Sequence, residues 1–168
     1  MTRSDFEDLL AANAEYADRF DRGQLQPLAA RGLAILTCMD SRIDPLAALG
    51  LAAGDAKILR NAGARVTEDV LRTLVLAAHL LGVNRILVMP HTRCRMAETT
   101  EEEIHQVIAE RSGVDTRSLE FRTQRDQTSA LRQDLVRIRS FPLLPPALVV
   151  GGAIYDVATG KLHPVDLG

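Results

Sequence analysis

The chain has 168 residues, 46% of them hydrophobic and 25% charged, which is typical of one soluble domain with a single core. Its net charge of −2 gives no reason to expect a nucleic acid or an anionic membrane as a partner, and no apolar run is long enough to cross a bilayer. The acidic start lacks the apolar core of a signal peptide, and there are only two cysteines, so we expect a cytoplasmic protein with free or metal-bound thiols.

The first predicted element is an amphipathic helix over residues 4–20. Ser4 and Glu7 have the spacing of a capping box at its start. A linker over residues 21–31 separates this helix from the rest of the chain. The helix can pack on its own domain or on a second subunit, and the residues alone leave both arrangements open.

From residue 33 onward, short apolar runs alternate with helical patterns. The runs predict strands over residues 33–37, 56–59, 85–89 and 147–150. The patterns predict a short helix from Asp44 and longer helices over residues 68–81, 100–111 and 126–139. A hairpin then brings back residues 161–165 as an edge strand. This order predicts an α/β fold whose central sheet has four parallel strands and one antiparallel edge strand, flanked by helices.

Three potential metal ligands follow the first and third of these strands. Cys38 ends the first apolar run, and His91 and Cys94 come just after the third. Because open α/β sheets place their sites at the carboxyl ends of the strands, we expect these side chains to meet. Two thiolates and one imidazole are three ligands of a tetrahedral zinc, with a fourth position left for water. The alternatives are a chance His-x-x-Cys spacing and a buried, inert Cys38.

Asp40 and Arg42 lie two residues apart just beyond Cys38, close enough for a bidentate ion pair. A surface salt bridge of little energetic value is the alternative. With Arg42 holding it, Asp40 would accept a hydrogen bond from zinc hydroxide, and the cation would make the zinc-bound water more acidic. Released from Arg42, Asp40 would instead fill the fourth zinc position and close the site.

The loop after the second strand reaches the same edge of the predicted sheet. Its Asn61 and Gly63 suit a turn with positive φ, and its backbone N–H groups can also face the site. Neither role excludes the other. The residues that we expect to line the site are Ser41, Asn61, Ala62, Gly63 and Arg95.

We expect two of the remaining histidines to lie outside this site. His79 falls within the helix over residues 68–81, and we expect it to be packed or partly exposed rather than a ligand. His105 lies on the helix over residues 100–111, and we expect it to face solvent.

Together, the motifs Cys38-Met39-Asp40-Ser41-Arg42, Arg60-Asn61-Ala62-Gly63 and His91-Thr92-x-Cys94 resemble the β-class carbonic anhydrases, most closely the small, archaeal-type branch. The resemblance covers residues 33–168. It implies one Zn²⁺ per chain held by Cys38, His91 and Cys94, a catalytic Asp40–Arg42 dyad, and reversible hydration of CO2 to bicarbonate. It also implies a single domain over residues 1–168. In that domain a helix within residues 1–22 embraces a neighbouring subunit, giving a homodimer or a higher homo-oligomer.

The chain departs from the family's usual His-x-x-Cys-Gly pattern, because Arg93 and Arg95 flank Cys94. Losing the glycine removes conformational freedom at the start of the following helix. The two cations would stabilise the zinc-bound thiolate, but they could equally bind bicarbonate or block the entrance. Two alternatives therefore stay open. One is a hydrolase of carbonyl sulfide or carbon disulfide on the same zinc site, and the other is a zinc-bearing protein without catalytic activity.

Overall fold

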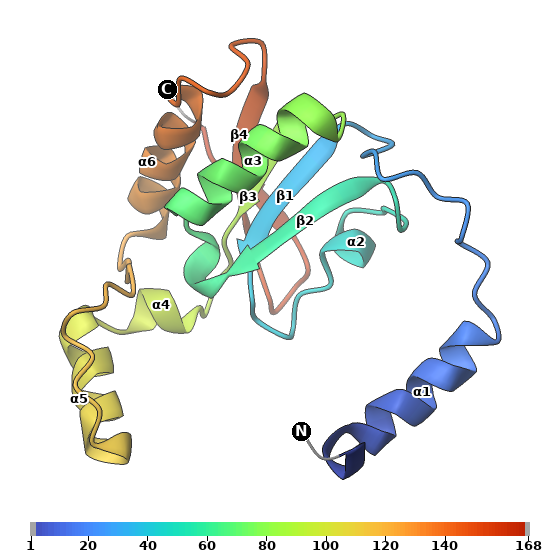
Figure 1. Ribbon diagram of the computed structural model, residues 1–168. Helices are drawn as coiled ribbons and strands as arrows, with labels where there is room; N and C mark the ends of the chain where they lie inside the picture. Colours follow the sequence, from blue (N-terminus) through green and yellow to red (C-terminus); the bar gives the residue numbers. More distant parts are fainter. Residues whose placement is uncertain (1–2, 167–168) are drawn as a thin grey trace.

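The centre of the molecule is a five-stranded sheet, seen in a computed structural model that describes residues 3–166 (Figure 1). The strands are β1 (Leu33–Cys38), β2 (Ala56–Asn61), β3 (Arg85–Met89), β4 (Val149–Tyr155) and β5 (Leu162–Pro164). Their order across the sheet is β2-β1-β3-β4-β5. All neighbours pair in parallel except β4 and β5, which are antiparallel. The predicted sheet of four parallel strands with an antiparallel edge strand is confirmed.

The register of the sheet brings three loops to one edge. Cys38 of β1 pairs with Asn61 of β2, and Thr37 pairs with Met89 of β3. The loops that follow these strands therefore leave the sheet side by side. Strand β1 lies between two parallel partners and is buried on both faces, which explains why its sequence is a continuous apolar run rather than an alternating one.

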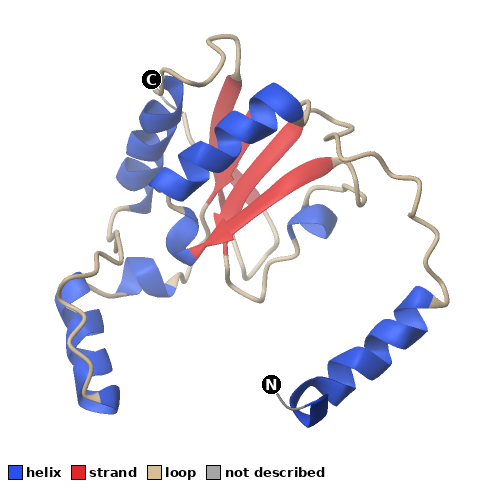
Figure 2. Ribbon diagram, viewed as in Figure 1, coloured by secondary structure: helices blue, strands red, loops and turns tan. Residues whose placement is uncertain are grey.

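Helices cover both faces of the sheet, as predicted. They are α1 (Glu7–Ala17), α2 (Pro45–Ala48), α3 (Glu68–Leu80), α4 (Arg95–Glu98), α5 (Glu101–Ser112) and α6 (Gln127–Arg139). Helices α3 and α6 lie beside the sheet (Figure 2). They share a large apolar core with it, in which Leu36, Leu74 and Leu135 are fully buried. Each such side chain contributes roughly 1.5–3 kcal/mol to folding. The opposite face has a smaller core around Ile35 and Met89, which also contains both cysteines.

Side-chain and glycine caps mark the ends of two helices in the body of the protein. The Thr67 hydroxyl accepts a hydrogen bond from the backbone N–H of Val70 at the start of α3. Thr100 and Glu103 form a reciprocal capping box on α5, and Gly113 ends that helix with a φ of 71°. These local signals set where the helices begin and end.

Some predicted boundaries are wrong. Strand β2 continues to Asn61 rather than ending at residue 59, because its pairing with β1 continues through Cys38. Strand β4 spans Val149–Tyr155 instead of residues 147–150. Gly151 and Gly152 lie inside the strand, and Gly152 gives Leu131 and Leu135 room to pack: a Cβ there would come within 2.8 Å of the Leu135 side chain.

The N-terminal helix extends away from the body of the protein (Figure 1). The α-helix covers Glu7–Ala17, preceded by a 3-10 turn over Arg3–Phe6, so it is shorter than predicted. Its N-cap residue is Phe6, which makes no side-chain cap, and the Ser4 side chain of the predicted capping box lies outside the described part. No residue of α1 is buried, so the helix does not pack on its own domain. None of the described helices has the length and apolar character needed to span a membrane.

The prediction that His105 faces solvent is wrong. Residues 113–125 run back along α5 (Figure 1). The His105 ring contacts this segment, and its side chain is 15% exposed. Its Nδ1 is 2.9 Å from the Thr116 hydroxyl, and its ring centroid is 5.3 Å from that of Phe121. His79 is an exposed residue of α3 whose Nε2 lies 2.9 Å from the carbonyl oxygen of Leu143, and it does not belong to the group of potential metal ligands.

Candidate metal centre

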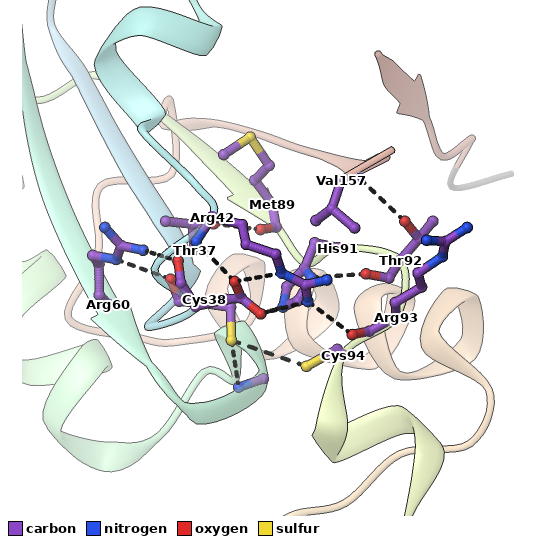
Figure 3. Close-up of polar contacts among 12 residues, drawn as sticks. Thr37, Cys38, Arg42, Arg60, Met89, His91, Thr92, Arg93, Cys94 and Val157 are labelled. Atoms are coloured by element: carbon purple, nitrogen blue, oxygen red, sulfur yellow. Dashed lines mark hydrogen bonds and ion pairs between the residues drawn. The ribbon is translucent and has the colours of Figure 1, made fainter. Parts of the chain in front are cut away.

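The three predicted ligands meet at the carboxyl edge of the sheet. Cys38 is the last residue of β1, while His91 and Cys94 lie in the loop between β3 and α4. Their ligand atoms all lie within 4.8 Å of one another, and all three residues are buried (Figure 3). The two sulfur atoms are 3.9 Å apart. The juxtaposition follows from the register, because β1 and β3 are adjacent and end together.

The environment of His91 favours a metal at this position. The residue is 0% exposed, and its Nε2 has no hydrogen-bond partner among the described residues. Nδ1 lies 2.9 Å from the carbonyl oxygen of Thr92, so Nδ1 carries the proton and donates it there, leaving a lone pair on Nε2. A buried polar atom without a partner is costly. A metal ion bound by this lone pair and the two sulfurs removes that cost.

The two cysteines also behave as a pair of metal ligands. The Cys94 thiol beside Cys38 lowers the pKa of Cys38, and the backbone N–H of Gly63 assists by donating to the Cys38 sulfur at 3.4 Å. The same sulfur–sulfur contact, together with burial, raises the pKa of Cys94. These opposite shifts are those expected when one sulfur donates a hydrogen bond to the other. A divalent cation in place of that hydrogen would bind both as thiolates.

Asp40 and Arg42 form the predicted bidentate pair at the rim of this centre. Arg42 donates from Nε to Asp40 Oδ1 at 2.9 Å and from Nη2 to Oδ2 at 2.7 Å, and its backbone N–H also donates to Oδ1. These bonds hold the pKa of Asp40 well below its usual range, so the group is a carboxylate. Asp40 Oδ2 is also 3.8 Å from Nε2 of His91. The carboxylate thus lies beside the ligands while both of its oxygens remain bound to Arg42.

Further hydrogen bonds tie the three loops together. Arg42 Nη2 donates to the carbonyl oxygen of Arg93 at 3.0 Å, which links the loop after β1 to the loop after β3. From β2, Arg60 donates to the carbonyl oxygens of Cys38 at 2.9 Å and of Asp40 at 2.6 Å (Figure 3). The backbone around the ligands is therefore fixed from two neighbouring strands.

Two of these positioning contacts were missed by the sequence analysis. Arg60 was assigned to the loop motif without a role, although its pairing with Thr37 in the sheet places it beside the Cys38 loop. Gln127, at the start of α6, donates to the carbonyl oxygen of His91 at 2.7 Å. No sequence signal identifies Gln127, because it lies 36 residues beyond its partner and reaches it only through the packing of α6.

A cavity of about 730 Å³ opens over the centre. It is lined by Cys38, Met39, Asp40, Ser41, Arg42, Ala62, Cys94, Arg95 and Met96. Of the five residues expected to line the site, Ser41, Ala62 and Arg95 are in this lining. Asn61 instead closes the following turn, accepting from the backbone N–H of Arg65 at 2.9 Å and donating to its carbonyl oxygen at 2.7 Å. Gly63, with a φ of 79°, turns its N–H toward the Cys38 sulfur.

Comparisons with known proteins agree with this arrangement. A family model described as carbonic anhydrase matches residues 33–162. β-Carbonic anhydrase 1 of Mycobacterium tuberculosis is 38% identical over 160 residues, covering 95% of this chain and 96% of the relative. A carbon disulfide hydrolase of Saccharolobus solfataricus is 31% identical over 157 residues, covering 79% of this chain and 76% of the relative. The crystal structure of a carbonic anhydrase from Streptococcus mutans has a TM-score of 0.91 at 39% identity, covering 99% of this chain and 100% of that one.

Proposed function

Because the chain belongs to the β-carbonic anhydrase family, we propose that it catalyses the reversible hydration of CO2 to bicarbonate. Members of this family use zinc, and Cys38, His91 and Cys94 form a group that could bind it. The observation that carries the proposal is the buried Nε2 of His91, which has no hydrogen-bond partner in the described part of the chain and lies 3.8 Å from a carboxylate oxygen. The ligand atoms of His91 and the two cysteines lie within 4.8 Å of one another. Zinc bound by these three residues would acidify a coordinated water and so supply a nucleophile near neutral pH.

In this proposal, Asp40 orients the attacking water. An ionised carboxylate can only accept hydrogen bonds, so Asp40 would take the water's O–H and leave an oxygen lone pair free to attack the carbon of CO2. Arg42 positions the carboxylate through two side-chain hydrogen bonds and one backbone hydrogen bond. Without Arg42, Asp40 would be free to enter the ligand set and close the site, which makes Arg42 a positioning residue.

The reaction also releases one proton, since CO2 and water give bicarbonate and H⁺. The cavity lining offers no histidine among the described residues, and the low pKa of Asp40 makes it a poor proton acceptor near pH 7. We infer that external buffer takes the proton. Turnover at saturating CO2 should therefore rise with buffer concentration when ionic strength is held constant.

Carbon disulfide or carbonyl sulfide hydrolysis is the second candidate activity. It is supported by the Saccharolobus solfataricus relative, whose described activity is on carbon disulfide. That relative is less similar to this chain and covers less of it than the mycobacterial β-carbonic anhydrase does. CO2 is therefore the substrate that we favour.

We further propose that the protein forms a homodimer or a higher homo-oligomer through α1. Apolar side chains on and just beyond this helix are 41–59% exposed, namely Phe6, Leu9, Leu10, Tyr16 and Phe20. Such a row of side chains marks an interaction surface. On the body, a cavity of about 370 Å³ is lined partly by Leu33, Leu49, Leu51 and Leu87, so apolar surface is available for another copy.

We also propose that the protein is cytoplasmic, because its two free, buried cysteines suit a reducing compartment.

Stopped-flow CO2 hydration, measured between about pH 6.5 and 9 on protein of known zinc content, tests the proposed activity. We expect one zinc per chain and a rate that rises with pH as the metal-bound water ionises. Full zinc occupancy without CO2 turnover at any pH would refute the proposal. Carbonyl sulfide and carbon disulfide turnover on the same sample would then separate a hydrolase from an inactive zinc protein.

A further inference from the structure

The arginines near the metal centre differ in whether their guanidinium groups already have hydrogen-bond partners in the protein. Arg42 is bound to both oxygens of Asp40 and to the carbonyl oxygen of Arg93. Arg60 is bound to the carbonyl oxygens of Cys38 and Asp40. Both guanidinium groups therefore hold the loops in place through these hydrogen bonds. Neither can bind a ligand without breaking at least one of these bonds.

Arg95 is different. It is the first residue of α4, its side chain is exposed, and it lines the same cavity as the two cysteines. It makes no hydrogen bond or ion pair with any other residue in the described part of the chain. It is also the residue that replaces the glycine of the family pattern noted in the sequence.

Among the charged groups that line the cavity, Arg95 is the one whose charge no neighbouring group of the lining neutralises. Asp40 and Arg42 neutralise each other through their bidentate pair. Two thiolates, a neutral His91 and a divalent cation also sum to zero. The lining of the loaded site would then carry one net positive charge, located on Arg95, an exposed residue of the cavity lining.

We propose that Arg95 is a docking residue for small planar monovalent anions at the mouth of this cavity. The geometry of a guanidinium suits such anions, because two parallel N–H groups match two oxygens in a plane. The identification of bicarbonate as the natural ligand rests on the proposed function. The existence of an anion site at Arg95 does not depend on that function. CO2 carries no charge and gains nothing from Arg95. The residue therefore acts on bicarbonate, as substrate of the reverse reaction and as departing product.

Arg93 provides a matched control. It flanks Cys94 on the other side and carries the same charge, but its side chain does not line the cavity. Figure 3 shows that side chain turned away from Cys94, toward Thr92. Arg93→Ala and Arg95→Ala thus remove the same charge next to the same cysteine, and only Arg95→Ala removes it from the cavity.

The direct test measures nitrate binding to the zinc-loaded protein by NMR titration at constant ionic strength. Nitrate has the charge and planar shape of bicarbonate and is not turned over. We expect Arg95→Ala to raise the dissociation constant about fivefold, which corresponds to the ~1 kcal/mol of an ion pair at 4 Å in water. Arg93→Ala should raise it by less than about twofold, because a more distant charge is screened by salt.

The kinetic test compares the two directions of the reaction. Arg95→Ala should raise KM for bicarbonate by a similar factor and leave KM for CO2 unchanged. Since the equilibrium constant fixes the ratio of the two kcat/KM values, kcat for dehydration should rise together with KM. Zinc content and Tm should equal those of the wild type, because Arg95 contacts no other described side chain through a polar bond.

Equal weakening of nitrate binding in both variants, or no change in either, would overturn the anion site. An equal change in KM for CO2 and bicarbonate would overturn the assignment to bicarbonate. If the zinc-loaded wild type does not hydrate CO2, the proposed function fails, while the nitrate titration still judges Arg95 independently.

Discussion

Strand β1 and helix α1 both carry several apolar side chains, but they differ in what covers them. In β1 every residue from Ala34 to Cys38 is buried, between β2 and β3 and beneath packed side chains on both faces. In α1 no residue is buried, and Leu9 and Leu10 are more than half exposed. The strand thus obtains its packing from its own chain, whereas the helix leaves its apolar face available to another molecule.

This difference predicts two kinds of response to substitution. Changes at the end of β1 should affect zinc, turnover and stability in every single chain, at any protein concentration. Changes in α1 should affect assembly, so their effect should depend on concentration. The comparison fails if a change in one region produces the response expected of the other.

The largest effect is expected from Cys38→Ser. A hydroxyl is a poor replacement for a zinc-bound thiolate, so zinc content should fall close to zero and turnover should be lost. Loss of zinc held at about 1,000 times its Kd would lower the free energy of unfolding by about 4 kcal/mol. Metal analysis and thermal unfolding measure both effects. Ser41→Ala, which alters the same cavity without touching a ligand, should keep its zinc. A Cys38→Ser variant that retains zinc and turnover would contradict the ligand assignment.

Asp40→Asn should come next, with zinc retained and CO2 hydration reduced roughly 10²–10³-fold. The amide has nearly the same shape, but it carries no charge, and one of its two polar atoms donates rather than accepts. Stopped-flow rates per bound zinc measure the change. Arg42→Ala should also lose activity by releasing Asp40 toward the metal, which the absorption spectrum of the cobalt-substituted protein would report as a changed ligand set. Near-normal rates in Asp40→Asn would rule out its role in orienting water.

The Asp40–Arg42 pair also predicts a dependence of stability on acid. The folded-state pKa of Asp40 is lower than its unfolded value, so the pair's contribution is fully present above about pH 4 and is lost as the pH falls below that. The free energy of unfolding of the wild type should therefore decrease more steeply below about pH 4 than that of Arg42→Ala. Denaturant titrations at several pH values measure the two slopes. Parallel slopes would show that the pair contributes little to stability.

Removal of α1 should weaken assembly and leave the metal centre intact. Deletion of residues 1–22 is expected to raise the dimer dissociation constant about a hundredfold or more, since burial of each Leu or Phe contributes roughly 1.5–3 kcal/mol. Sedimentation across a range of concentrations measures this, and zinc content serves as the control. Leu9→Asp should have the same direction of effect, whereas Glu15→Ala, on an exposed polar position of the same helix, should have little. An unchanged dimer would place α1 elsewhere.

The mostly parallel sheet and the meeting of Cys38, His91 and Cys94 could be predicted because both depend on where apolar runs begin and end. Parallel neighbours end at one edge, so residues at their ends converge even though Cys38 and Cys94 are 56 positions apart in the sequence. The Asp40–Arg42 pair was predictable for a simpler reason, since the two residues are close along the chain. These features needed only short-range patterns and a general rule of topology.

Contacts made by long side chains between distant segments were not predictable in this way. Arg60 reaches the carbonyl oxygens of the Cys38 loop, and Gln127 reaches that of His91, only after the sheet register and the packing of α6 are known. The burial of His105 similarly depends on residues 113–125, which have no periodic pattern. Its partners, Thr116 and Phe121, come from a segment that sequence analysis can describe only as irregular.

The smallest predicted effect concerns the backbone beside the metal ligands. Arg93 has a φ of 54°, a conformation that is unfavourable for most residues and tolerated better by Asn. Arg93→Asn should therefore stabilise the zinc-loaded protein by about 0.5 kcal/mol while its carbonyl oxygen continues to accept from Arg42. Urea unfolding at a fixed zinc concentration measures the difference. Arg95→Asn is the matched control. It removes the same charge, but at a residue with an ordinary helical backbone. Equal stabilisation by both substitutions would show that the effect comes from relief of repulsion between the two arginines and not from the backbone conformation of residue 93.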